Sequence, residues 1–354
     1  MSGKPLMTLA IPFYNHIRFV DEAVRSALAQ DYPNCEIILS DDCSTDGTGE
    51  RIRELVAEYK GPHKVTVNVN DRNLGIGAHM AKIVSLCHGD WVATQGGDDA
   101  ALPDRLSVTA DYARRYPDAS AIGVGAMAID ENSCRIEDSH CVSGPVVYEK
   151  FTDGRGPMTM SLNPGDNVSF AMIIGAMAAY RRDVLELAPF RTGIGVEDLY
   201  LCCRAILLGD IVFATERCVL QRINSSSLTR AMRKGGSRSL RRKKRREMFG
   251  RIYSTYQNLL DEAKGYPFQV PNEWLCAIDS RCAEGRLTLL KRGSASLGNA
   301  SGYAADFRAS RMGVGEVWKK AFKLGTHWHV AKALACSVFA KAVKSDTGGQ
   351  YGAK

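Results

Sequence analysis

The chain has 354 residues, of which 45% are hydrophobic and 24% are charged, as in ordinary globular proteins. No stretch approaches about 18 uncharged apolar residues, so we expect no membrane-spanning helix. The N-terminal segment MSGKPLMTLAIPFYN lacks a signal-peptide pattern, so export is not expected. The 11 cysteines form no CxxC pair or metal-binding spacing. They indicate reduced, mostly buried thiols in a cytoplasmic protein.

The first part of the chain alternates apolar segments with amphipathic ones. We expect strands at 6–14, 35–42, 64–70 and 90–95, and helices at 16–30, 48–60 and 77–89. This alternation predicts an α/β fold with a mostly parallel sheet flanked by helices. Ligands of such sheets bind beyond the carboxyl ends of the strands, where Asp41, Asp42, Asp98 and Asp99 fall.

The pattern changes after residue 117. We expect a strand at 119–130, a strand that passes into a helix at 175–187, a helix at 195–209, and short strands at DIVFA and RCVLQRI. Residues 140–168 are rich in Gly, Pro, Asp and Asn, and predict a long loop of the kind that is functional or disordered. Near residue 228 the composition becomes basic and the pattern helical. We therefore predict an α/β domain over 1–228 and a basic, mainly helical region over 229–354.

Three acidic motifs each allow two interpretations. The segment DDCSTDGT (41–48) favours either a ligand-binding turn that accepts hydrogen bonds from a nucleobase or ribose, or an ordinary turn that caps a helix. In GGDD (96–99), the carboxylates suit Mg²⁺ or Mn²⁺ on a diphosphate, and the glycines permit close approach of a ligand. A solvated acidic turn before the helix near Pro103 is the alternative.

The third motif is VEDLYL (196–201), which places Glu197 and Asp198 at the start of a helix. Acids at this position are stabilised by the helix dipole, whatever else they do. Asp198 also has the chemistry of a general base that takes a proton from an attacking hydroxyl. The segment NLGIG (73–77) is too short for a dinucleotide fingerprint and favours a turn that enters a helix.

Order and spacing connect these motifs. The series IPFYN, EIILSDDCSTDGT, NLGIG, GDWVATQGGDDAALPDRL, GAMAAYRRDVLE and EDLYLCCRAILLGDIVFATERCVLQR resembles family 2 glycosyltransferases over residues 6–228. The resemblance implies the GT-A fold, a Rossmann-like sheet, here with a C-terminal helical extension. It also implies inverting transfer of a sugar from a nucleotide-diphospho-sugar to a hydroxyl of a polysaccharide, glycolipid or lipid-linked acceptor, as in hexosyltransferases.

The same resemblance implies roles for individual residues. Nucleotide-sugar binding falls to Pro12, Tyr14, Asp42, Asn73, Gly75, Gly97 and Asp98. Asp98 and Asp99 match metal-binding acids for Mn²⁺ or Mg²⁺, and Asp198, beside Glu197, matches the catalytic base. The acceptor side is assigned to Gly175, Ala176 and Arg181. His79 and Arg222 are candidates for contact with the diphosphate. The 140–168 loop would close over the donor.

The chain departs from the family pattern at several positions. Gly96 stands where the family's D-x-D motif has an acid, and Asn224 stands where Arg-x-His has histidine. Met80 and Ala81 replace an expected asparagine or arginine. These losses motivate an alternative, a non-catalytic GT-A protein that serves binding or assembly. A sugar-phosphate nucleotidyltransferase is disfavoured, because IPFYNHIRF lacks a glycine-rich loop with Arg and Thr.

The segment 230–251 carries eleven Lys and Arg residues and one acid. Three interpretations remain open: a solvated helical face, attraction to an anionic membrane, and nucleic-acid binding. The core of the run has no aromatic residues interleaved with the charges, so no nucleic-acid partner is expected. A lipid-linked acceptor would favour a peripheral position at the inner face of the plasma membrane. The segment 316–344 suits an interfacial helix or a helix packed on the catalytic domain.

Overall fold

The computed structural model describes residues 4–137, 157–161, 173, 175–191, 194–223, 238–271, 274–275 and 278. The chain divides into two compact units. The first comprises Met1–Asn163 and Ser169–Gly235, and the second comprises Pro164–Val168 and Gly236–Lys354. The domain boundary expected at residue 228 lies outside the described residues and stays a prediction.

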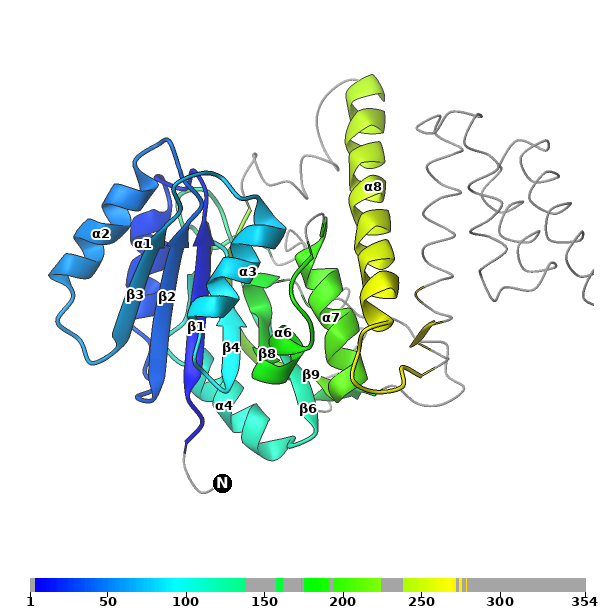
Figure 1. The fold of residues 1–354 in the computed structure, drawn as a ribbon. Helices are drawn as coiled ribbons and strands as arrows, with labels where there is room; N and C mark the ends of the chain where they lie inside the picture. Colours follow the sequence, from blue (N-terminus) through cyan, green and yellow to red (C-terminus); the bar gives the residue numbers. More distant parts are fainter. Residues whose placement is uncertain are drawn as a thin grey trace, which may run out of the picture. The chain divides into compact units, whose positions relative to one another are not determined.

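The first unit begins with the expected βαβ units. Strands β1 (Met7–Phe13), β2 (Cys35–Asp41), β3 (Lys64–Val69) and β4 (Trp91–Thr94) are parallel, in the order β3-β2-β1-β4. They are linked by α1 (Val20–Leu28), α2 (Thr48–Glu58) and α3 (Ile76–Leu86). Figure 1 shows α1 and α2 on one face of the sheet and α3 on the other. The helices form because their apolar residues share one face, and α1 buries Val20, Ala23, Val24 and Ala27.

The sheet continues beyond β4 with antiparallel and parallel strands. Strand β8 (Ala178–Arg181) runs antiparallel between β4 and β6 (Ala119–Ile129), and β9 (Asp210–Arg222) runs parallel to β6. Two short strands, β5 (Ala100–Ala101) and β7 (Met158–Met160), pair antiparallel with β9. The helices here are α4 (Arg105–Arg115), α6 (Arg182–Glu186) and α7 (Glu197–Leu208), with a short 3-10 turn, η2 (Gly175–Met177), before β8.

The prediction of two separate short strands after α7 is wrong. The segments DIVFA and RCVLQRI form the single strand β9, because its pairing with β6 continues across the exposed residues 215–217. Shifts in register around Gly125 of β6 absorb the interruption. An added Cβ at Gly125 would lie 2.8 Å from the Cγ of Arg217, so the glycine allows this close crossing.

Six of the described strands end at one edge of the sheet, which we call the carboxyl edge. Because β1, β2, β3, β4, β6 and β9 are mutually parallel, their last residues lie along it: Phe13, Asp41, Val69, Thr94, Ile129 and Arg222. The chain leaves β4 at this edge directly into GGDD. The described residues therefore confirm a mixed, mostly parallel sheet flanked by helices, with its acidic turns on the expected side.

The described part of the second unit contains the helix α8 (Arg238–Ala263). Among the described residues, no helix combines the length and the apolar character needed to cross a bilayer. The basic segment 230–251 lies outside the described residues up to residue 237 and continues into α8. Most of the expected 140–168 loop and all of 316–344 also lie outside the described residues.

At the edge of the sheet opposite the carboxyl edge, a buried carboxylate ties β1, β2 and β4 together. Glu36 accepts hydrogen bonds from the hydroxyl of Thr8 at 2.8 Å, the backbone N–H of His88 at 2.5 Å, and the His88 ring at 3.1 Å. Burial alone would raise the pKa of Glu36, but these bonds outweigh burial and hold its pKa below the ordinary value. The charged form therefore stabilises the fold at neutral pH.

We expect Glu36→Gln to lower the free energy of unfolding by about 1–3 kcal/mol at neutral pH, because an amide cannot accept all three bonds. A lowered pKa contributes stability above the unfolded-state value and loses it as the pH falls through the folded-state value. The deficit should therefore shrink below about pH 4. Urea unfolding across pH measures it, with Glu58→Gln, an exposed glutamate on α2, as the control. A deficit no larger than the control's would contradict this role.

Candidate functional site

Asp42 lies at the carboxyl edge, where it organises the turn that enters α3. Its carboxylate accepts the N–H groups of Leu74 at 2.8 Å and Gly75 at 3.0 Å, and the side-chain amide of Asn70 at 2.8 Å. The side chain of Asn73 donates to the Asp42 carbonyl at 3.3 Å. Gly75 has φ +75, and an added Cβ there would meet nothing within 4 Å. The structure thus brings Asp42, Asn73 and Gly75 together beside open space.

The remaining polar residues of DDCSTDGT join the end of β2 to the segment after β1. Asp46 accepts the N–H of Ile17 at 3.0 Å and the N–H of Thr48, the first residue of α2, at 3.1 Å. The hydroxyl of Ser44 accepts the N–H of Asn15 at 2.8 Å. The N-cap residue of α2 is Gly47, so Asp46 supports the start of the helix from the position before the cap. These hydrogen bonds hold Tyr14, which is 47% exposed, at the carboxyl edge close to the half-buried Pro12.

Each glycine of GGDD allows a close contact between its backbone and neighbouring atoms that a side chain would prevent. An added Cβ at Gly97 would lie 2.7 Å from the Phe13 ring and 2.8 Å from the Pro12 carbonyl, so this glycine packs against the end of β1 rather than against open space. An added Cβ at Gly96 would lie 2.6 Å from Asp99 Oδ2 and 3.0 Å from Asp98 Oδ1. Both carboxylates therefore reach toward the same point above the Gly96 backbone, which an acidic side chain at residue 96 would fill.

This carboxylate pair fits a divalent cation. Burial, followed by the charge of Asp98, raises the pKa of Asp99 to about 8, so the pair carries repulsion that a cation would relieve. Among the described residues no group of three His, Cys, Asp or Glu side chains could hold a metal. A two-carboxylate site that leaves its other positions to phosphate and water suits Mg²⁺ and Mn²⁺.

Asp198 is the second residue of α7, and its carboxylate lies at the same edge, where it contacts η2. The N–H of Gly175 donates to its carboxylate, and an added Cβ at Gly175 would lie 2.5 Å from Asp198 Oδ1. The Gly175 carbonyl in turn accepts the hydroxyl of Thr94, the last residue of β4, at 2.5 Å. These two contacts link Asp198 to β4, the strand that leads into the turn with Asp98 and Asp99. Half-buried Ala176 follows within the same turn.

The environment of Asp198 makes its carboxylate more basic than a solvated one. Burial of the carboxyl raises its pKa well above the ordinary value, the charge of neighbouring Glu197 raises it further, and the Gly175 N–H opposes both. A carboxylate with a raised pKa is a stronger base, and it accepts a proton more readily than a fully solvated one. Glu197, also half-buried at the start of α7, acts on Asp198 electrostatically.

The structure does not bring Arg181 to this site, which corrects the expectation of an acceptor-side role. Arg181 pairs with Trp91 at the start of β4, so it lies at the opposite edge of the sheet from Asp98. Its guanidinium binds Asp183 at 2.9 Å and donates to the carbonyls of Ala119 and Leu208. It therefore secures the far ends of β6 and α7.

His79 also differs from its expected role. The ring lies on the buried face of α3 and is 2% exposed, and its Nε2 lies 2.7 Å from the hydroxyl of Ser40 in β2. Burial lowers the pKa of His79 although the charges of Asp42 and Asp41 oppose that effect. A ring enclosed in this way supports the Asp42 turn from beneath and does not reach a diphosphate.

Arg222 is close to the acidic turn, yet its guanidinium is enclosed by protein. Its Nε donates to the Asp98 carbonyl at 2.8 Å, its Nη1 donates to the Asp130 carbonyl at 2.7 Å, and its Nη2 pairs with Glu22. The side chain is only 1% exposed. The expected contact with a diphosphate is therefore corrected, because no face of the guanidinium is open to one. Asn224 lies outside the described residues.

Sequence reasoning missed His16. Its ring lies against Gly97. Burial lowers the pKa of His16, although the nearby charges of Asp98, Asp46 and Asp41 oppose that effect. It thus stands between the DDCSTDGT and GGDD turns. The only signal in the sequence is the position of His16 directly after IPFYN, where the apolar spacing predicts the start of a helix.

Comparison with known proteins agrees with this arrangement. The sequence profile described as Glycosyl transferase family 2 matches residues 8–187. A "Putative colanic acid biosynthesis glycosyl transferase WcaA" of Escherichia coli (strain K12) is 34% identical over 108 residues, which is 30% of this chain and 38% of that protein. The chain spans less than half the length of several curated bacterial relatives that it matches.

Two solved structures share the fold at low sequence identity. S. aureus TarS 1-349, in complex with UDP-GlcNAc, has a TM-score of 0.59 and 16% identity, covering 98% of this chain and 92% of that one. The mannosyltransferase PcManGT from Pyrobaculum calidifontis, in complex with GDP-Man and Mn²⁺, has a TM-score of 0.52 and 14% identity, covering 99% and 89%.

These likenesses confirm the expected GT-A arrangement of the sheet and helices. The profile covers half of the chain and includes β1 to β4, the GGDD turn and β8. Together with the acidic carboxyl edge, it settles the family: the chain belongs to glycosyltransferase family 2.

Proposed function

We propose that the protein is an inverting glycosyltransferase that moves a sugar from a nucleotide-diphospho-sugar to a hydroxyl of a saccharide or lipid-linked acceptor. The observation that supports this most is the placement of Asp198 and the Asp98–Asp99 pair at one edge, connected through Gly175 and Thr94. The colanic acid relative supports a polysaccharide product, and the sugar nucleotides bound by TarS and PcManGT support the donor class.

The donor would lie across the carboxyl edge. The nucleobase would meet Tyr14 and the backbone near Pro12, with the Asp42 turn, Asn73 and Gly75 beside it. Asp98 and Asp99 would hold a divalent cation, Mn²⁺ or Mg²⁺, which supplies charge neutralisation for the departing nucleoside diphosphate. The Mn²⁺ present in PcManGT supports this assignment. Gly97 contributes by letting the acidic turn pack tightly against the end of β1.

Asp198 would activate the acceptor. Its carboxylate takes the proton of the acceptor hydroxyl while that oxygen bonds to the anomeric carbon, and the bond from this carbon to the phosphate oxygen breaks. One displacement from the opposite face inverts the configuration, so a single base suffices. Gly175 and Ala176 would line the acceptor side, where Gly175 leaves room for the carboxylate and its N–H orients it.

The same proposal covers the location of the protein. A cytoplasmic enzyme with a lipid-linked acceptor would work at the inner face of the plasma membrane, and the basic segment 230–251 would favour binding to anionic lipid.

The non-catalytic alternative depends partly on the absence of an acid at Gly96. In the structure the space above Gly96 is taken by the carboxylates of Asp98 and Asp99, so the missing acid does not leave the turn without carboxylate oxygens.

Replacing the base tests the reaction directly. We expect Asp198→Asn to lower the rate of transfer, or of donor hydrolysis, by about 10²- to 10⁴-fold, because the amide cannot accept the proton. Nucleoside diphosphate release from UDP-, GDP- and dTDP-sugars with Mn²⁺ measures the rate, and thermal shift shows that donor binding persists. A variant that keeps the wild-type rate would exclude Asp198 as the base. A wild-type protein that turns over none of these donors would favour a binding protein instead.

The pH profile of the reaction tests the environment of the base. Asp198 must be deprotonated to act, so activity should fall on the acid side with a midpoint above the ordinary carboxyl value of about 4. Glu197→Gln removes a charge that raises the pKa of Asp198, so this variant should move the midpoint to lower pH while keeping activity at neutral pH. The opposite shift, or none, would show that Glu197 does not act on the base.

Metal binding tests the carboxylate pair without turnover. We expect Mn²⁺ to raise the melting temperature of the wild-type protein in the presence of UDP or GDP, and Asp98→Asn to abolish most of that increase. Asp31→Asn, which changes an exposed aspartate far from GGDD in the sequence, serves as the control. An equal Mn²⁺ effect in Asp98→Asn and wild type would remove the metal assignment.

A further inference from the structure

Arg222 occupies a position that the proposed chemistry does not use. It ends β9 at the carboxyl edge, directly behind GGDD, and it is the arginine of a run first expected to face a diphosphate. Its side chain is 1% exposed, so a full positive charge is buried within the protein. Buried charges persist where they are paired and hydrogen-bonded, and this one has such partners on three segments.

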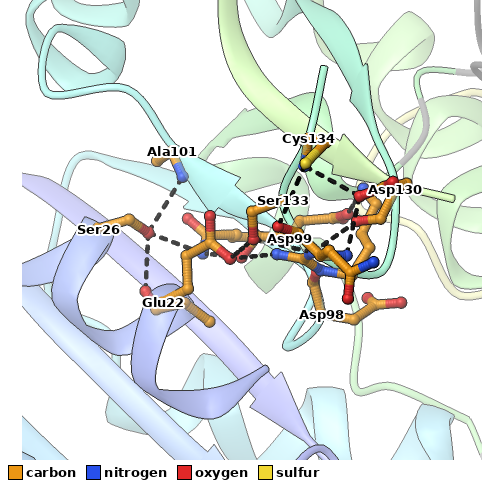
Figure 2. A network of polar contacts seen from close by, with 12 residues as sticks. Glu22, Ser26, Asp98, Asp99, Ala101, Asp130, Ser133 and Cys134 are labelled. Atoms are coloured by element: carbon orange, nitrogen blue, oxygen red, sulfur yellow. Dashed lines mark hydrogen bonds and ion pairs between the residues drawn. The ribbon is translucent and has the colours of Figure 1, made fainter. Parts of the chain in front are cut away.

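The contacts of Arg222 form a hub, and Figure 2 shows how its partners Glu22, Asp98, Asp99, Asp130 and Ser133 lie close to one another. Its own backbone N–H donates to Asp99 Oδ1 at 2.8 Å, and its Nε donates to the Asp98 carbonyl at 2.8 Å. Its Nη1 reaches the turn after β6, at the carbonyl of Asp130 and, at 3.2 Å, the hydroxyl of Ser133. Both acids of GGDD are therefore held by one residue.

Glu22 on α1 completes the hub. Its Oε2 pairs with Arg222 Nη2 and also accepts the Ser133 hydroxyl at 2.5 Å. The Arg222 guanidinium lies 4.8 Å from the centre of the Phe19 ring, immediately before α1. One turn further along α1, Ser26 accepts the N–H of Ala101 at 3.1 Å, just after GGDD. The helix thus fixes the acidic turn at both of its ends (Figure 2).

The geometry points to Arg222 as a positioning residue that sets the Asp98 and Asp99 carboxylates for the cation and diphosphate, with Glu22 fixing its orientation. This inference rests on the proposed function. Two carboxylates that converge over Gly96 repel each other when both are charged, and attachment of the Asp98 backbone opposes opening of the turn. The guanidinium supplies that attachment at the Asp98 carbonyl while it stays out of the site itself.

Side-chain variants separate this role from the fold. The bond from the Arg222 backbone N–H to Asp99 survives any substitution, whereas the bond to Asp98 and the pair with Glu22 depend on the guanidinium. Arg222→Lys keeps the charge but cannot make these divergent bonds together. Glu22→Gln removes the pairing charge from α1 and leaves Arg222 in place. Both variants act on Asp98 and Asp99 without changing either.

The experiment measures Mn²⁺ affinity in the presence of UDP, and in parallel GDP, by electron paramagnetic resonance of free Mn²⁺. We expect Arg222→Lys and Glu22→Gln to weaken Mn²⁺ binding by about 10- to 100-fold, the range found when supporting partners of metal ligands are removed. In turnover assays the Mn²⁺ concentration for half-maximal rate should rise, while kcat at saturating Mn²⁺ stays close to the wild-type value. A loss of folding alone would not produce that split.

The matched control is Arg18→Gln. Arg18 pairs with Glu131 at 3.3 Å, so it also joins the segment before α1 to the turn after β6, but this ion pair does not involve GGDD. It should keep the wild-type Mn²⁺ affinity. Arg222→Lys or Glu22→Gln variants that fold and bind Mn²⁺ as tightly as wild type would overturn the inference alone. A wild-type protein that binds no Mn²⁺ with either nucleotide would overturn the metal assignment and this inference together.

Discussion

The structure depends on holding two carboxyl groups close together at a partly buried edge of the sheet, where charging both of them is unfavourable. Asp98 and Asp99 converge above the Gly96 backbone, and the buried carboxyl of Asp99 has its pKa raised to about 8. Such a cluster opposes folding unless the backbone forces it, because desolvation and repulsion both disfavour the charges. Here two arginine side chains restrain the backbone of the turn. Arg222 donates to the Asp98 carbonyl, and Arg105 on α4 donates to the Thr94 carbonyl.

The missing side chains of glycine make this crowding possible in several places. Gly97 lets the turn approach the end of β1, and Gly175 lets Asp198 lie against the backbone before β8. Each contact brings two distant segments to the carboxyl edge, where the parallel strands end. Burial then raises the pKa of Asp198 as well. Cation binding and proton acceptance are thus expected from one physical device, the close approach of carboxylates to backbone that carries no Cβ.

The order of strands and helices was predictable from the sequence, because alternating short apolar runs and amphipathic segments have few ways to pack. The strand ends also located Asp42, Asp98 and Asp99, and the start of a predicted helix located Asp198. Sequence could not distinguish an open arginine from an enclosed one, so Arg222 was assigned to the diphosphate although Glu22, two hundred positions earlier along the chain, neutralises it. Arg181 was misplaced because the antiparallel direction of β8, which carries it to the far edge, is invisible in the local pattern. His16 was missed because nothing local shows that Gly97 packs onto it.

The central claim is that the Asp98–Asp99 pair and Asp198 serve one bound donor. A crystal structure with Mn²⁺ and a nucleoside diphosphate, recorded near the manganese absorption edge, tests it most directly. The account predicts one anomalous peak between the carboxylates above Gly96, a nucleobase beside the Asp42 turn, and Asp198 facing the free end of the diphosphate. A nucleotide bound away from the carboxyl edge, or a metal peak that contacts neither Asp98 nor Asp99, would contradict it.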